Sequence, residues 1–71
     1  MNQIQDFQWM NQNYAMLQKK YPNMYVAIKD ENVIAANREF GRMYDEAMKK
    51  CKDFVTGYIL SGEPFVLKIN I

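Results

Sequence analysis

Cys51 is the side chain of this sequence best suited to act as a strong nucleophile. Lys49, Lys50 and Lys52 flank it, and nearby cations favour the reactive thiolate over the thiol. The sequence has no histidine to serve as its base, however, and Cys51 ends an apolar helical stripe. A free cysteine in such a position behaves as a small hydrophobic residue. We therefore interpret Cys51 as structural and expect a non-enzymatic protein.

The acidic residues give no pattern typical of a catalytic pair or a metal site. Asp30 and Glu31 are neighbours at an expected hairpin tip, and Asp45 and Glu46 point to different sides of an expected helix. Catalytic carboxylate pairs need burial to separate their pKa values, whereas these positions favour solvated side chains. The lack of histidine, the single cysteine and the isolated glycines exclude the common zinc and phosphate-loop motifs. We predict no catalytic, metal or cofactor residues.

Lysines gather at the ends of the two expected helices, where they could bind the backbone of a nucleic acid. If the helices ran side by side, these lysines would form one positive edge, with Tyr21 or Tyr25 available for stacking on bases. The same lysines also suit the negative end of a helix dipole, and the net charge is only +1. Weak nucleic-acid binding is therefore our alternative hypothesis, and the lysine edge would consist of Lys19, Lys20, Lys49, Lys50 and Lys52.

Large aromatic residues outnumber what the core of so small a domain needs. An exposed patch of aromatic side chains is typical of a protein interface. The candidate interface residues are Trp9, Tyr25, Tyr58 and Phe65. We therefore expect a small protein-interaction or regulatory module that acts through self-association, as a homo-oligomer, or through a protein partner.

Two helices follow from apolar residues at steps of three and four. The first is expected over Asp6–Lys20, with Asp6 as its N-cap, and Pro22 stops the pattern. The second is expected over Arg38–Lys52 with Asn37 as its cap, since Phe40, Met43, Tyr44, Ala47, Met48 and Cys51 form one apolar face.

Four segments have the alternation or the β-forming composition of strands. They are Met24–Lys29, Val33–Ala36, Phe54–Leu60 and Phe65–Ile71, and the first two form a hairpin in which Asn32 is expected to adopt a positive φ. The order α-β-β-α-β-β predicts an α+β fold with two helices on one face of a small, mostly antiparallel four-stranded sheet. The third strand would pair antiparallel with the first. Tyr25, Ala27 and Val66 would then line the open face of the sheet.

The length of 71 residues fits a single domain, residues 1–71. The longest apolar run, Met24–Ile28, is far shorter than the ~20 residues that a membrane helix requires. The first residues lack the positive start and apolar core of a signal peptide. We therefore expect a cytoplasmic protein that does not bind membranes.

Part of the chain resembles a family of small uncharacterised prokaryotic domains. The resemblance is carried by Tyr14–Leu17, Lys19–Tyr21, Tyr25–Asp30 and Val33–Ala36, which match a Y-V-A-x-x-D…V-x-A hairpin between two helices. It covers roughly residues 13–52, with a weaker match at residues 62–66. Members with Asp-Gly at the hairpin turn differ from this chain, which has Asp30-Glu31-Asn32. The resemblance implies a fold and no activity.

Overall fold

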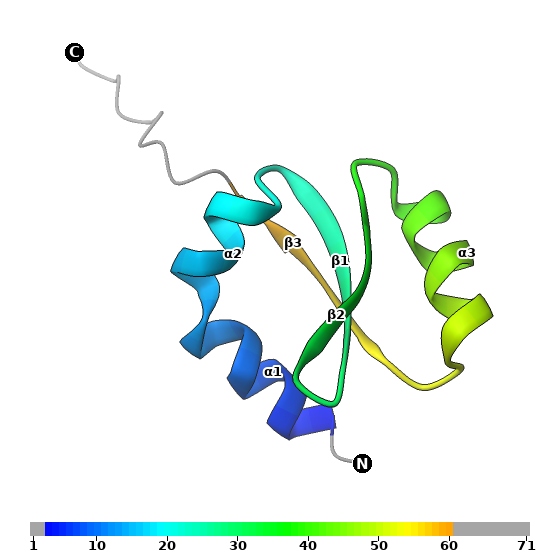
Figure 1. Cartoon of the computed structure of the whole chain (residues 1–71), viewed down its shortest axis with the longest axis horizontal. Helices are drawn as coiled ribbons and strands as arrows, with labels where there is room; N and C mark the ends of the chain where they lie inside the picture. The colour runs from blue at the N-terminus through cyan, green and yellow to red at the C-terminus, as the bar shows by residue number, and fades with distance from the viewer. Residues whose placement is uncertain (1–2, 61–71) are drawn as a thin grey trace.

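Three helices and three strands make up residues 3–60, the part of the chain that the computed structural model describes (Figure 1). The α+β class is as expected from the sequence. The predicted fourth strand, Phe65–Ile71, lies outside the described residues. The elements are α1 (Gln3–Gln12), α2 (Tyr14–Lys20), β1 (Met24–Lys29), β2 (Asn32–Asn37), α3 (Phe40–Lys50) and β3 (Val55–Ile59).

The three strands form an antiparallel sheet in the order β2-β1-β3. β1 therefore occupies the centre, and β3 pairs antiparallel with it, as predicted. The register places Tyr25 opposite Tyr58 and Val26 opposite Gly57. Between β1 and β2 the register shifts after Ala27, and Ile34 of β2 is left without an opposite residue. This irregularity has the form of a β-bulge, which bends and twists the strand locally.

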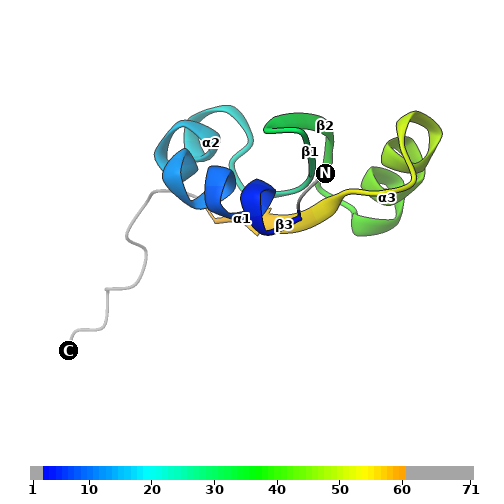
Figure 2. The ribbon, with the colours of Figure 1, turned by 90° about the horizontal axis from the view of Figure 1, so that it is seen from below.

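The helices lie on opposite faces of the sheet, and the prediction of two helices on one face is wrong. Figure 2 shows α1 and α2 on one side of the strands and α3 on the other. Leu17 of α2 packs with Val26 and Ile28 of β1, whereas Met43 of α3 packs with Ala27. Consecutive residues of a strand point to opposite faces, so β1 is covered on both sides.

Small side chains explain why the second face of the sheet accepts a helix. Ala27 and Ala35 are buried there, beneath Met43 and Ala47 of α3. Alanine presents little side chain, so a helix can approach the strands closely at these positions. The sequence prediction treated Ala27 as part of an open face because the residue alternates with the larger Val26 and Ile28.

The first helical region is divided at Asn13, where the sequence predicted one continuous helix. The side-chain amide of Asn13 donates a hydrogen bond to the main-chain oxygen of Trp9 at 2.9 Å, beside the backbone bond to that same oxygen. Asparagine competes in this way for backbone groups and disfavours the interior of helices. The region also begins at Gln3, before the predicted cap Asp6.

Asp6 instead connects α1 to the β-hairpin. Its side chain is buried, and its Oδ1 accepts a hydrogen bond from the backbone N–H of Glu31 at 2.9 Å. Asp30 and Glu31 form the two-residue turn, with φ of 53° and 60°. Such turns require positive φ at both central residues. The prediction that Asn32 adopts the positive φ is therefore wrong; its side-chain amide donates to the main-chain oxygen of Asp30.

The prediction that Asn37 caps the second helix is wrong, because Asn37 lies two residues before the N-cap position of α3. The Oδ1 of Asn37 accepts a hydrogen bond from the backbone N–H of Glu39 at 2.9 Å, and the helix itself begins at Phe40. Glu39 occupies the N-cap position without a side-chain cap bond. Asn37 thus stabilises the turn that leads into α3.

Candidate interaction surface

Five aromatic rings form a continuous row across α3 and the adjoining edge of the sheet. We call this row the aromatic strip; it consists of Tyr58, Tyr25, Phe40, Tyr44 and Phe54. Successive ring centroids lie 4.8, 5.4, 5.7 and 5.4 Å apart in that order. These spacings and the mostly edge-to-face or tilted geometry are those that aromatic quadrupoles favour. These contacts between neighbouring rings hold the five side chains in place on the α3 side of the molecule.

Much of the aromatic strip is exposed to solvent. Phe40, Tyr44 and Tyr58 keep 44, 42 and 43% of their surface accessible, and Met48 beside them keeps 38%. Tyr25 and Phe54 are half-buried. Several large apolar side chains that adjoin one another on a surface are typical of a site that another molecule covers. The strip is therefore the candidate functional surface.

The exposure follows from the width of the apolar face of α3. Met43 and Ala47 are one turn apart and face the sheet, where Ala27 and Ala35 receive them. Phe40, Tyr44 and Met48, also at steps of four, form the adjacent row of the same helix. The three-stranded sheet buries one of these rows and leaves the other at its margin.

The predicted interface residues do not form one surface in the described part of the chain. Tyr25 and Tyr58 are in contact within the aromatic strip. Trp9 is half-buried on the other face, where it packs against the core of Leu17 and Val26. Phe65 lies outside the described residues.

Sequence analysis did not select Phe40, Tyr44 or Phe54 for the interface. It placed Phe40 and Tyr44 on the apolar face of the helix, together with Met43 and Ala47. Six apolar residues lie on this face between Phe40 and Cys51, more than Ala27 and Ala35 of the sheet can cover. This excess of apolar residues was the signal in the sequence for an exposed row.

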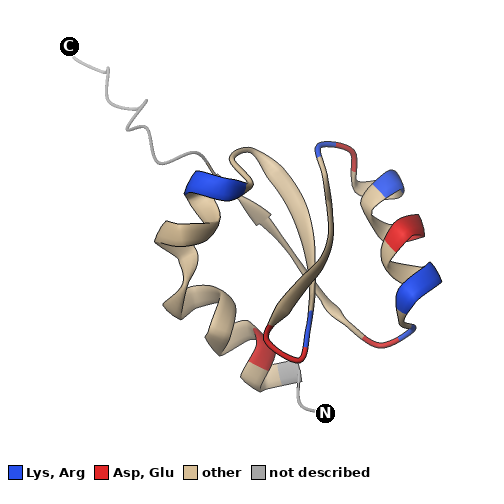
Figure 3. Cartoon of the chain, viewed as in Figure 1, with Lys and Arg blue, Asp and Glu red and all other residues tan. Residues whose placement is uncertain are grey.

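The lysines of the predicted edge are not brought together. Lys19 and Lys20 end α2, whereas Lys49 and Lys50 end α3 and Lys52 follows it. Figure 3 shows these basic groups far apart, across the sheet from each other. A positive edge shared by both helices therefore does not form within residues 3–60.

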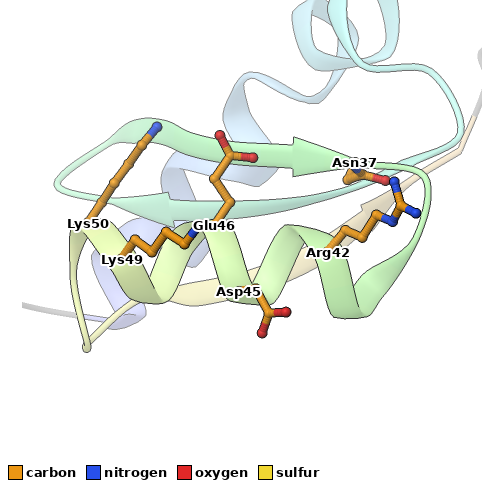
Figure 4. A pocket seen from close by; sticks show the side chains of 6 residues that line it. All are labelled: Asn37, Arg42, Asp45, Glu46, Lys49 and Lys50. Carbon is orange, nitrogen blue, oxygen red and sulfur yellow. The ribbon is translucent and has the colours of Figure 1, made fainter.

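A hollow of about 490 Å³ lies along the polar side of α3, but its charges are mixed. Figure 4 shows Lys50 and Glu46 extending toward the hairpin and Asp45 pointing away from it. The Nζ of Lys50 donates to the main-chain oxygen of Ile34 at 2.7 Å. Arg42, also in the wall, forms an ion pair with Glu39 at 2.9 Å. The hollow is lined by charges of both signs, and Lys50 and Arg42 already have partners in the protein. It therefore favours neither an anion nor a cation as a ligand.

Cys51 contacts the loop that follows α3 and is half-buried. Its Sγ lies 3.2 Å from the main-chain oxygen of Asp53, to which it donates, and accepts from the N–H of the same residue at 3.4 Å. Both bonds hold the turn between α3 and β3. Among residues 3–60, no cluster of acidic or cysteine side chains has the arrangement of a metal site.

Lys29 connects β1 to that same turn. Its Nζ lies 3.4 Å from Oδ2 of Asp53. Desolvation lowers the pKa of Lys29, but the hydrogen bond and the negative charge of Asp53 outweigh it, with smaller contributions from Cys51 and Asp30. The pKa is therefore raised above the ordinary 10.5.

No helix within residues 3–60 is long and apolar enough to cross a membrane.

The sequence of residues 16–59 matches the model of a family of unknown function, DUF5678. The chain belongs to this family. This agrees with the resemblance to a family of small uncharacterised domains. Comparison with curated proteins and with solved structures gave no match.

The DUF5678 match includes every residue of the aromatic strip. It extends from within α2 through the hairpin and α3 to the end of β3. α1, with Asp6 and Trp9, lies before it. The candidate surface thus belongs to the segment shared with the family, whereas the α1 contacts come from outside that segment.

Proposed function

We propose that this chain is a small non-enzymatic interaction module of the cytoplasm that self-associates through the aromatic strip. The observation that carries the proposal is the exposure of Phe40, Tyr44 and Tyr58 within one continuous row of ring contacts. Aromatic and methionine side chains are enriched in protein interfaces, and anchor residues with most of the binding energy are often aromatic.

The geometry of α3 supports a second copy of the chain as the partner. Phe40, Tyr44 and Met48 recur every four residues, and such rows form the ridges that pack into the grooves of a facing helix. Two copies related by a two-fold axis would place the same row on both sides of the contact. Each ring pair formed across it would contribute about 0.5–1.5 kcal/mol beyond the burial of apolar area.

Sedimentation equilibrium of the wild-type protein and of two alanine variants tests this proposal. We expect Tyr44→Ala to weaken the self-association constant at least about tenfold, which corresponds to about 1.4 kcal/mol. Met16→Ala is the matched control, because Met16 is similarly exposed, at 36%, but lies in α2 on the opposite face. A wild-type protein that stays monomeric at about 1 mM, the weak end of specific association, would overturn the proposal.

A further inference from the structure

β2 is an edge strand whose own sequence gives no protection against further pairing. Within residues 3–60 the sheet ends at β2, which pairs with β1 alone. Its six residues, Asn32–Asn37, include neither a charged residue nor a proline. Edge strands usually carry lysine, other charges or proline, because their unpaired main-chain groups are a template for another strand. An uncharged segment with β-branched residues and no proline has the composition that favours pairing between chains.

α3 leaves space beside this edge. The hollow of about 490 Å³ is lined by Asn37, at the end of β2, and by side chains of α3. Figure 4 shows Lys50 and Glu46 extending from the helix toward the strand. A strand added to β2 would lie about 4.8 Å from it, on the side of the hollow.

Lys50 reaches the main chain of β2 across this hollow. Its Nζ donates to the main-chain oxygen of Ile34 at 2.7 Å. The register shift explains why this oxygen is available, since Ile34 has no opposite residue in β1. Ile34 and Ala35 both pack toward α3, although consecutive residues of a regular strand alternate between faces. The bulge thus holds the main-chain oxygen of Ile34 within reach of the last turn of α3.

We propose that the β2 edge is a second self-pairing surface, which Lys50 closes against β2 of another copy of the chain. A further strand must place its N–H groups on the outward main-chain oxygens of β2, and the ammonium of Lys50 occupies one of them. The incoming strand would also remove water from that charge, which is costly without a new partner. With Lys50 removed, two copies of β2 can pair antiparallel about a two-fold axis, because the strand carries no like charges that would oppose each other.

The β2 edge is distinct from the aromatic strip, so this inference goes beyond the proposed function. The hollow is lined by Arg42, Glu46 and Lys49, whereas Phe40 and Tyr44 of the strip lie on the other flank of α3. A chain with both surfaces open would have two separate two-fold contacts and would form open-ended assemblies. Closure of the β2 edge limits association through the strip to pairs.

Sedimentation velocity of Lys50→Met in a Tyr44→Ala background tests the proposal. Methionine retains a long unbranched side chain but has neither the charge nor the donors of lysine. The Tyr44→Ala parent has the strip weakened, so the comparison measures the β2 edge. We expect Lys50→Met to raise the self-association constant at least about tenfold over this parent. Hydrogen exchange of the β2 amides that are not bonded to β1 should then slow as the protein concentration rises.

Lys49→Met is the matched control, because it removes the same charge from the same hollow and leaves the Lys50 contact in place. It should sediment like the parent. Lys50→Arg retains a cation with several donors and should also sediment like the parent. Protected β1 amides in each variant show that the fold is intact.

Three results would overturn the proposal. The first is a Lys50→Met variant that sediments like the parent up to about 1 mM. The second is an equal increase in Lys49→Met, which would make the lost charge the cause. The third is association that leaves the β2 amides unprotected. A wild-type protein that stays monomeric would overturn self-association through the strip but not this comparison, since the parent already lacks Tyr44.

Discussion

Replacement of Asp6 with alanine tests whether α1 is held to the hairpin by one carboxylate. Only 5% of Asp6 is exposed, and its Oδ1 accepts the N–H of Glu31 at 2.9 Å. Removal of the acceptor leaves a partly buried N–H without its partner in the turn. A hydrogen bond to a charged group contributes about 1.5–3 kcal/mol, and the lost bond should cost an amount of this order. We expect Asp6→Ala to lower the free energy of unfolding by about 2 kcal/mol.

Such a loss is large for a domain of this size. At roughly 0.05–0.15 kcal/mol per residue, the whole chain has a stability of about 4–11 kcal/mol. With a urea slope near 1 kcal/mol/M, typical of the smallest proteins, the unfolding midpoint should fall by about 2 M. Circular dichroism in urea at neutral pH measures this shift directly.

Asp45→Ala provides the comparison, because Asp45 is exposed on α3. Surface substitutions of this kind usually change stability by less than about 0.5 kcal/mol. Asp6→Asn retains an oxygen acceptor without the charge, so its midpoint should fall between those of wild type and Asp6→Ala. Equal midpoints for Asp6→Ala and Asp45→Ala would refute the role assigned to the buried carboxylate.

Two further predictions concern the hairpin turn and the loop before β3. Glu31→Gly should raise the free energy of unfolding by about 0.5–1 kcal/mol in urea titration, because Glu31 has a φ of 60° that glycine adopts without steric cost. A lower midpoint than wild type would contradict this. The raised pKa of Lys29 stabilises the fold below the ordinary pKa of 10.5, and this contribution is lost as the pH rises through the folded-state pKa. Unfolding measured between pH 9 and pH 11.5 should therefore show a smaller decline in Asp53→Asn, and identical declines would exclude the ion pair as its cause.

The sequence predicted the helices and strands better than it predicted their arrangement in space. Helical periodicity located α3, and the β-formers of Met24–Lys29 defined β1 with the observed ends. The break at Asn13 depends on one side-chain amide bond, which an apolar pattern does not reveal. The positive φ values fell on Asp30 and Glu31 because the two-residue turn is set by the strand register.

The candidate surface was only half predictable for a related reason. Periodicity identifies which face of a helix is apolar, but the extent of burial depends on the partner. Tyr25 and Tyr58 were selected from the strands, whereas Phe40 and Tyr44 were placed only on the apolar face of the helix. The core proved too narrow to cover them, because a helix that rests on Ala27 and Ala35 buries a single row.

The central strand has a consequence for how the sequence of this protein can diverge. α3 has no contact with α1 or α2, and the core on each face of the sheet forms a separate cluster. Substitutions on one face thus meet no side chain of the other and can be compensated locally. Val26, Ala27 and Ile28 are the exception, since all three are fully buried and their shared backbone sets the position of both clusters. Insertion or deletion of one residue in this strand would exchange the faces to which the following side chains point. The number of residues in β1 is therefore fixed, whereas in the helices the constraint falls on which residue types occupy the buried positions.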